Sequence, residues 1–179
     1  METINAKDFY KVWLETVNNR KVELENNWRK NKLFTKLIIG SENSIIGEIA
    51  NKLDLLSYEN DYYCIDAILY KKEDKTPDIN ENLFWFRDLR VAFEHENNFS
   101  SGLFQEVSHL LITNCDLKVL VTYPNGGIEN ELNYLHKIIM GNRNSKNISD
   151  EENFLLIFGY KNKFKWEGRI FKSDKWKNI

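Results

Sequence analysis

The sequence predicts an α/β fold: a mixed β-sheet flanked by helices, with an N-terminal helix before it and a C-terminal β-hairpin after it. Three observations lead to this class. Helical and strand-like periodicities follow one another along the chain, one strand–helix–strand unit occurs, and a short turn joins the last two strand segments. With 179 residues, the chain can bury a core without a disulfide or metal, so we expect a single domain over residues 1–179.

The N-terminal third is expected to form two amphipathic helices. Apolar residues at helical spacing over residues 9–28 predict the first helix. A short apolar connector over residues 33–39 should follow and end at Gly40. The second helix is expected from about Ser41, a candidate N-cap, with an apolar stripe over residues 45–56.

The rest of the chain alternates between strands and helices. Segments rich in β-branched and aromatic residues predict strands at 62–70, 89–96, 116–123, 154–160 and 164–171, with a short strand or turn at 83–86. Helices are expected at 103–111 and 128–140, and polar loops at 71–82 and 141–152.

Composition excludes several classes of protein. The chain has 25 Lys+Arg against 27 Asp+Glu and a net charge of −2, so it is not a nonspecific polycation. A nuclease stays possible, because its own carboxylates offset a basic groove. Cys64 and Cys115 are too few for a disulfide framework or a zinc site, and both are expected to be buried free thiols.

The sequence also bears on where the protein is expected to work. No basic-then-apolar signal region opens the chain, and no run of about 18 apolar residues predicts a transmembrane helix. We therefore expect a cytoplasmic protein without a membrane partner.

Three carboxylates on two neighbouring strands are the strongest chemical signal. Glu94 and Glu96 end one strand two residues apart and so project from the same face of the sheet, while Asp66 lies inside the preceding apolar strand. Acids gathered in this way repel one another unless a hard divalent cation with oxygen ligands joins them. The side chain of His95 should point to the other face, but its backbone carbonyl lies between the two glutamates and could be a further ligand.

On these residues the chain resembles the PD-(D/E)xK, or restriction-endonuclease-like, nuclease superfamily, over about residues 41–123. The resemblance implies a core of a helix, a strand meander, a helix and a further strand. It also implies that Asp66 and Glu94 bind Mg²⁺, with Mn²⁺ as a possible substitute. Glu96 takes the position of the family's lysine, and Glu48 on the preceding helix matches an acid that some members add to the site.

The departures from the family pattern leave alternatives open. Ile65 stands where the family has a proline before the first acid. The dipeptide Pro77-Asp78 also matches the proline and acid of the motif, although Asp78 falls in a polar loop. Lys118 could be a relocated lysine, but it begins a strand expected to run parallel to that of Glu94, so it should lie at the opposite end. The three histidines have no ligand spacing among themselves, and Glu106 is expected to be a solvated neighbour.

The resemblance implies a metal-dependent endonuclease that hydrolyses phosphodiester bonds in DNA, with Glu96 as the base. Because the lysine is missing, a catalytically silent protein of the same fold, acting as a DNA-binding or structural subunit, is the alternative. An unrelated α/β interaction domain is the third reading. Cleavage of both strands would favour a homodimer or a partner subunit.

Lysines in the C-terminal hairpin are the candidate DNA contacts. Lys161, Lys163 and Lys165 alternate along the chain and could share one face, where they would meet phosphates. The alternative is an edge hairpin that lysines keep from aggregating.

Overall fold

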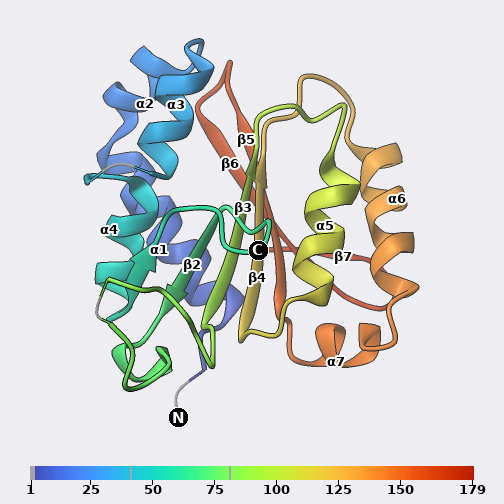
Figure 1. Cartoon of the computed structure of the whole chain (residues 1–179). Helices are drawn as coiled ribbons and strands as arrows, with labels where there is room; N and C mark the ends of the chain where they lie inside the picture. The colour runs from blue at the N-terminus through green and yellow to red at the C-terminus, as the bar shows by residue number, and fades with distance from the viewer. Residues whose placement is uncertain (1–2, 41, 81) are drawn as a thin grey trace.

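A seven-stranded mixed sheet with helices on both faces forms the centre of the fold (Figure 1). The computed structural model describes residues 3–40, 42–80 and 82–179. The strands are β1 Leu56–Tyr58, β2 Ala67–Tyr70, β3 Val91–Glu96, β4 Leu117–Thr122, β5 Phe154–Tyr160, β6 Lys165–Phe171 and β7 Trp176–Asn178. They lie side by side in chain order; β3, β4 and β5 are parallel, and every other neighbouring pair is antiparallel. The α/β class and the mixed sheet are confirmed.

The helices divide between the two faces of the sheet (Figure 1). One face carries α1 Ala6–Asn19, α2 Lys21–Asn27, α3 Asn31–Ile38 and α4 Ile45–Lys52; the other carries α5 Leu103–Ile112 and α6 Glu129–Met140, with α7 Ser145–Asp150 and the 3₁₀ turn η1 Lys72–Asp74 in connections. None of the helices in the described part of the chain is both long and apolar enough to span a bilayer.

Alternation along β3 decides which side chains face which helices. Val91 and Phe93 are buried in the core beneath α1 and α4, whereas Ala92 is buried in the core beneath α5 and α6. Because successive strand residues point to opposite faces, Glu94 projects toward α5 and His95 toward the N-terminal helices. The loops after β3, β4 and β5 all leave from one end of the sheet (Figure 1).

The N-terminal helices differ from the expectation in their boundaries. The helix expected over residues 9–28 breaks at Arg20, and the expected connector over 33–39 is the helix α3. Phe34 and Ile38, one helical turn apart, are fully buried, so tertiary packing explains why this short segment is helical. Ser41 lies outside the described residues; the N-cap of α4 is Ser44, whose Oγ accepts a hydrogen bond from the Gly47 N–H at 2.9 Å.

The strand predicted at 62–70 is wrong in its first half. The backbone folds into a tight turn in which Tyr62 and Ile65 pair, Tyr63 and Cys64 have φ of +52° and +68°, and Cys64 is exposed. The tyrosines here pack against other rings, with Tyr62 5.2 Å from Phe86 between centroids, rather than along a strand. Aromatic content alone therefore does not distinguish a strand from a packed turn.

Four further short elements were missed: β1 in the tail of the expected second helix, η1 and α7 inside expected loops, and β7 after the hairpin. Each of the two strands has only three residues and depends on its neighbour for hydrogen bonds. The hairpin of β5 and β6 and its turn after Tyr160 are as predicted.

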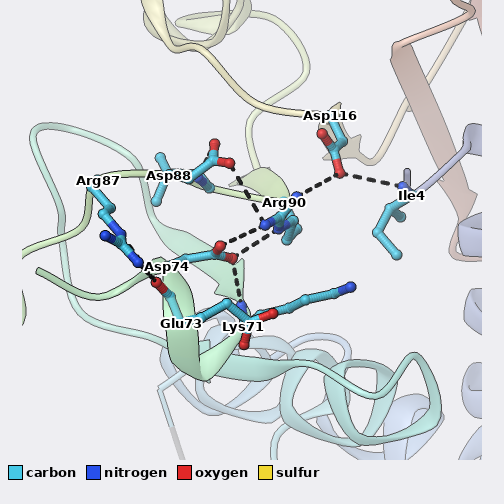
Figure 2. A network of polar contacts seen from close by, with 9 residues as sticks. Ile4, Lys71, Glu73, Asp74, Arg87, Asp88, Arg90 and Asp116 are labelled. Carbon is cyan, nitrogen blue, oxygen red and sulfur yellow. Dashed lines mark hydrogen bonds and ion pairs between the residues drawn. The ribbon is translucent and has the colours of Figure 1, made fainter. Parts of the chain in front are cut away.

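At the end of the sheet where β3 begins, a buried ion pair ties down the long loop between β2 and β3 (Figure 2). The guanidinium of Arg90 contacts both carboxylate oxygens of Asp74, at 2.8 and 2.5 Å. Asp116, whose carboxylate lies 3.7 Å from Arg90, accepts a hydrogen bond from the Ile4 N–H at 3.4 Å. The network thus links the loop, the start of β4 and the N-terminal segment.

Candidate functional site

Asp66 and Glu94 meet at the end of the sheet where β3 ends. Asp66 lies immediately before β2, and the antiparallel register pairs the next residue, Ala67, with Phe93. The Asp66 N–H donates a hydrogen bond to Glu94 Oε2 at 3.2 Å, and Asp66 Oδ2 accepts one from the His95 N–H at 2.9 Å. Two of the acids chosen from the sequence are therefore neighbours in space.

The carboxyl group of Glu94 is in an unfavourable place for a negative charge. Only 1% of the residue is exposed. Burial, then the charges of Asp66 and Glu106, raise its pKa to about 10. Burial also raises the pKa of Asp66, against the hydrogen bonds from His95 and Glu94. Without a cation, the raised pKa favours the protonated form of Glu94 near neutral pH.

Helix α5 adds two residues that the sequence reasoning did not select. His109 Nδ1 lies 3.6 Å from Glu94 Oε1 and 3.5 Å from Glu106 Oε2. One ligand atom from each of these three residues falls within 4.8 Å of the others. The i, i+3 spacing of Glu106 and His109, on the helix that follows the Glu94 strand, was the available signal. Glu106 is therefore not simply a solvated neighbour.

Glu96 lies at the margin of this cluster. It projects from the same face of β3 as Glu94, but its Oε1 accepts a hydrogen bond from the Asn98 N–H at 2.5 Å. A Cβ added at Gly102 would lie 3.4 Å from Glu96 Oε2, so the carboxylate occupies the loop before α5. Its charge still contributes to raising the pKa of Glu106, after burial and the charge of Asp66.

Three alternatives from the sequence lie elsewhere. Glu48 is on α4, against the other face of the sheet, where its carboxylate is 3.2 Å from the Lys52 ammonium. Asp78 is exposed in the loop between β2 and β3 at a φ of +59°. Lys118 is buried opposite Ala92, with its Nζ 3.8 Å from Cys115 Sγ. The structure does not bring these residues to the Asp66–Glu94 pair.

The His95 side chain points away from the carboxylates, as expected. Its ring is buried beneath α3, and Nε2 is 2.8 Å from the Tyr123 hydroxyl. Burial, helped by the nearby charge of Lys161, lowers its pKa to about 3, so the imidazole is neutral. The N–H and C=O of one strand residue point to the same side, so the His95 carbonyl faces Asp66 as its N–H does.

The three hairpin lysines line one groove of about 600 Å³, together with Tyr123 and Asn97. Lys161 lies over the rings of Tyr123 and Phe34, at 5.0 and 5.5 Å, and burial lowers the pKa of its ammonium. Lys165 is paired with Glu167, while the side chain of Lys163 is exposed. Asn97, directly after Glu96, lines the same groove, and its side-chain amide donates a hydrogen bond to Thr35 Oγ1 on α3 at 2.9 Å.

Comparison with protein-family models, curated proteins and solved structures finds no match to this chain. The geometry of the site therefore carries the functional argument.

Proposed function

We propose that the protein is a metal-dependent nuclease that hydrolyses phosphodiester bonds in DNA. The observation that carries the proposal is the contact between Asp66 and Glu94 across the start of β2 and the end of β3. An acid from each of two neighbouring antiparallel strands, brought together at one end of a sheet, can hold a divalent cation.

The order of elements supports the same reading. Helix α4, the meander β1–β2–β3, helix α5 and the parallel strand β4 follow one another over residues 45–122. That is the order of the restriction-endonuclease-like core that the sequence resembles. The acids also lie at the carboxyl ends of the parallel strands, which is the usual place for ligands in α/β folds.

The residues fit a divalent cation. Glu94 Oε1 is buried and has no hydrogen-bond partner among the described residues, so a cation would supply the contact it lacks. Asp66, Glu94 and the His95 carbonyl would hold the ion of the nuclease site. When bound, a divalent ion would supply Lewis-acid chemistry to a phosphodiester and favour a nucleophilic water.

The protein's own groups would orient the substrate and accept the proton. Lys161 and Lys163 would contact backbone phosphates from the groove that they line. Glu96 Oε2 would accept the proton of the attacking water, because Oε1 is already engaged by Asn98. This role requires the Glu96 carboxylate to turn from the loop toward the phosphate.

Plasmid cleavage with Mg²⁺ or Mn²⁺ tests the proposal. Wild type should nick or linearise the plasmid, and Glu94→Gln should reduce the rate by at least about 100-fold, since it removes a cation ligand at constant volume. Glu48→Gln is the matched control, because that glutamate is on the other face of the sheet, and it should cut like wild type. If Glu94→Gln cuts as fast as wild type, the proposed site is wrong.

The catalytically silent alternative rests on one observation, the carboxylate of Glu96 in the lysine position. Glu96→Lys would place a cation where charge develops and remove one acid from the cluster. Inert wild type together with an active Glu96→Lys variant would favour a DNA-binding or structural subunit. Light scattering would show whether the chain forms a homodimer.

A further inference from the structure

We infer that Glu94, Glu106 and His109 form a mixed carboxylate–imidazole site for a first-row transition metal ion such as Zn²⁺ or Mn²⁺, which binds there in preference to Mg²⁺. The inference builds on the cation site of the proposed function and extends it to helix α5. The missing hydrogen-bond partners, the spacing and the ligand chemistry of these three side chains support it.

Two buried polar atoms face each other where α5 packs on the end of β3. Glu94 Oε1 and His109 Nδ1 are both buried atoms with no hydrogen-bond partner among the described residues. They lie 3.6 Å apart, too far for a hydrogen bond between them. Since Glu94 is 1% exposed, solvent does not satisfy its oxygen either. A cation bound between Glu94 Oε1 and His109 Nδ1 would supply the contact that both atoms lack.

The spacing of the three ligand atoms is close to that required around one ion. Two atoms each about 2.1 Å from one ion, at an angle near 110°, are about 3.4 Å apart. His109 Nδ1 lies 3.6 Å from Glu94 Oε1 and 3.5 Å from Glu106 Oε2. The remaining carboxylate pair falls within the 4.8 Å span of the cluster. Shifts of a few tenths of an ångström on flexible glutamate side chains would complete a coordination shell.

The imidazole of His109 determines which kind of ion the site prefers. Mg²⁺ prefers oxygen ligands and keeps much of its water, whereas imidazole nitrogen is a ligand for zinc and its first-row neighbours. His109 supplies that nitrogen from a rigid helix, and its side chain is 34% exposed, which leaves a route for the ion to enter. The backbone N–H of Asp66, which donates a hydrogen bond to Glu94 Oε2, would orient the buried carboxylate.

Isothermal titration of the metal-free protein with Zn²⁺, Mn²⁺ and Mg²⁺ tests the site directly. Wild type should bind one Zn²⁺ or Mn²⁺ per chain, at least about 10-fold more tightly than Mg²⁺. His109→Gln should weaken Zn²⁺ binding by about 100-fold and leave Mg²⁺ binding nearly unchanged. His136→Gln is the matched control: that histidine contacts the Lys172 carbonyl beside α6, and its loss should change neither affinity.

X-ray absorption at the zinc edge needs no variant and guards against a failure to fold. It should detect scattering from one imidazole in a nitrogen and oxygen shell near 2.0–2.1 Å. An all-oxygen shell, equal affinity for Mg²⁺ and Mn²⁺, or Zn²⁺ binding by a folded His109→Gln variant at wild-type affinity would overturn the inference. Tight Zn²⁺ binding by a protein that does not cut DNA would keep the inference and reject the nuclease. Cleavage with Mg²⁺ alone and unchanged metal affinities in His109→Gln would do the reverse.

Discussion

Arg90 and Asp74 form a two-pronged buried ion pair, with Nε and one terminal nitrogen of the guanidinium on the two carboxylate oxygens (Figure 2). Their side chains are 5% and 3% exposed. Burial alone would raise the pKa of Asp74, but the hydrogen bonds from Arg90 and the Lys71 N–H lower it below its usual value. The loop between β2 and β3 is thus closed by a charge pair at the end of the sheet opposite the acidic cluster.

Removing one partner of the Arg90–Asp74 ion pair should destabilise the folded protein. Arg90→Met is expected to lower the free energy of unfolding by about 3–5 kcal/mol, because Asp74 is left buried without its counter-ion. Urea unfolding measures the change. The double variant Arg90→Met/Asp74→Leu should recover part of the loss, since no unpaired charge remains at Asp74. A single variant within about 1 kcal/mol of wild type would contradict this view of the pair.

The protonated state of Glu94 predicts an unusual dependence of stability on pH. Its pKa is raised to about 10 in the folded protein, so the stability it provides is present below the unfolded value of about 4.3 and lost as pH rises toward 10. With a chelator present, Glu94→Gln should therefore melt a few degrees higher than wild type at pH 8 and nearly equally at pH 4. Thermal melts at the two pH values test this, and equal melting at both would contradict it.

His95 should change the dependence of stability on pH in the opposite direction to Glu94. Its pKa is lowered to about 3 in the folded state, so the stability it provides is present above the unfolded value of about 6.5 and lost as pH falls. Because Glu94 opposes this trend, the comparison belongs in a Glu94→Gln background. There, adding His95→Gln should flatten the fall in melting temperature between pH 6.5 and 4. An unchanged fall would show that His95 is not buried in its neutral form.

The groove lysines should differ in their contribution to DNA binding. Replacing Lys161, Lys163 and Lys165 with alanine should reduce the slope of log affinity against log salt by up to about 0.9 per lost phosphate contact. The exposed Lys163 should contribute more than Lys165, which is already paired with Glu167. A fluorescence anisotropy titration at several salt concentrations measures the slopes.

The control for the lysine series is Lys146→Ala, which removes an exposed lysine paired with Asp150 on α7, away from the groove. Its slope should match that of wild type. An unchanged slope in the triple variant would mean that the hairpin lysines serve solubility alone.

Prediction from the sequence succeeded where an apolar strand segment is followed directly by charged residues. Strand β3 was recognised because Val91, Ala92 and Phe93 precede the glutamates, and the placement of Asp66 beside Glu94 followed from strand order. It failed where tertiary contacts decide. The turn at Tyr63 and Cys64 needs two residues with positive φ, which no glycine marks.

The α5 side of the site was missed for a different reason. The spacing among the three histidines along the chain gives no metal-ligand pattern, and Glu106 by itself has the pattern of a solvent-exposed helix residue. The contacts that form the site join a helix to a strand. Glu106 and His109 lie near Glu94 because α5 packs across β3. Such contacts depend on the packing of helix on sheet, which residue spacing within one segment does not reveal.

The turn before β2 also makes the two thiols of the chain chemically unequal. Cys64 is exposed in the turn, two residues from Asp66, whereas Cys115 is buried and burial raises the pKa of its thiol. A maleimide dye or nitroxide should therefore attach to Cys64 alone in the folded protein. The label would be within a few residues of the acidic cluster, so paramagnetic Mn²⁺ bound there should broaden the nitroxide spectrum. Metal binding could then be followed by spectroscopy with no engineered cysteine.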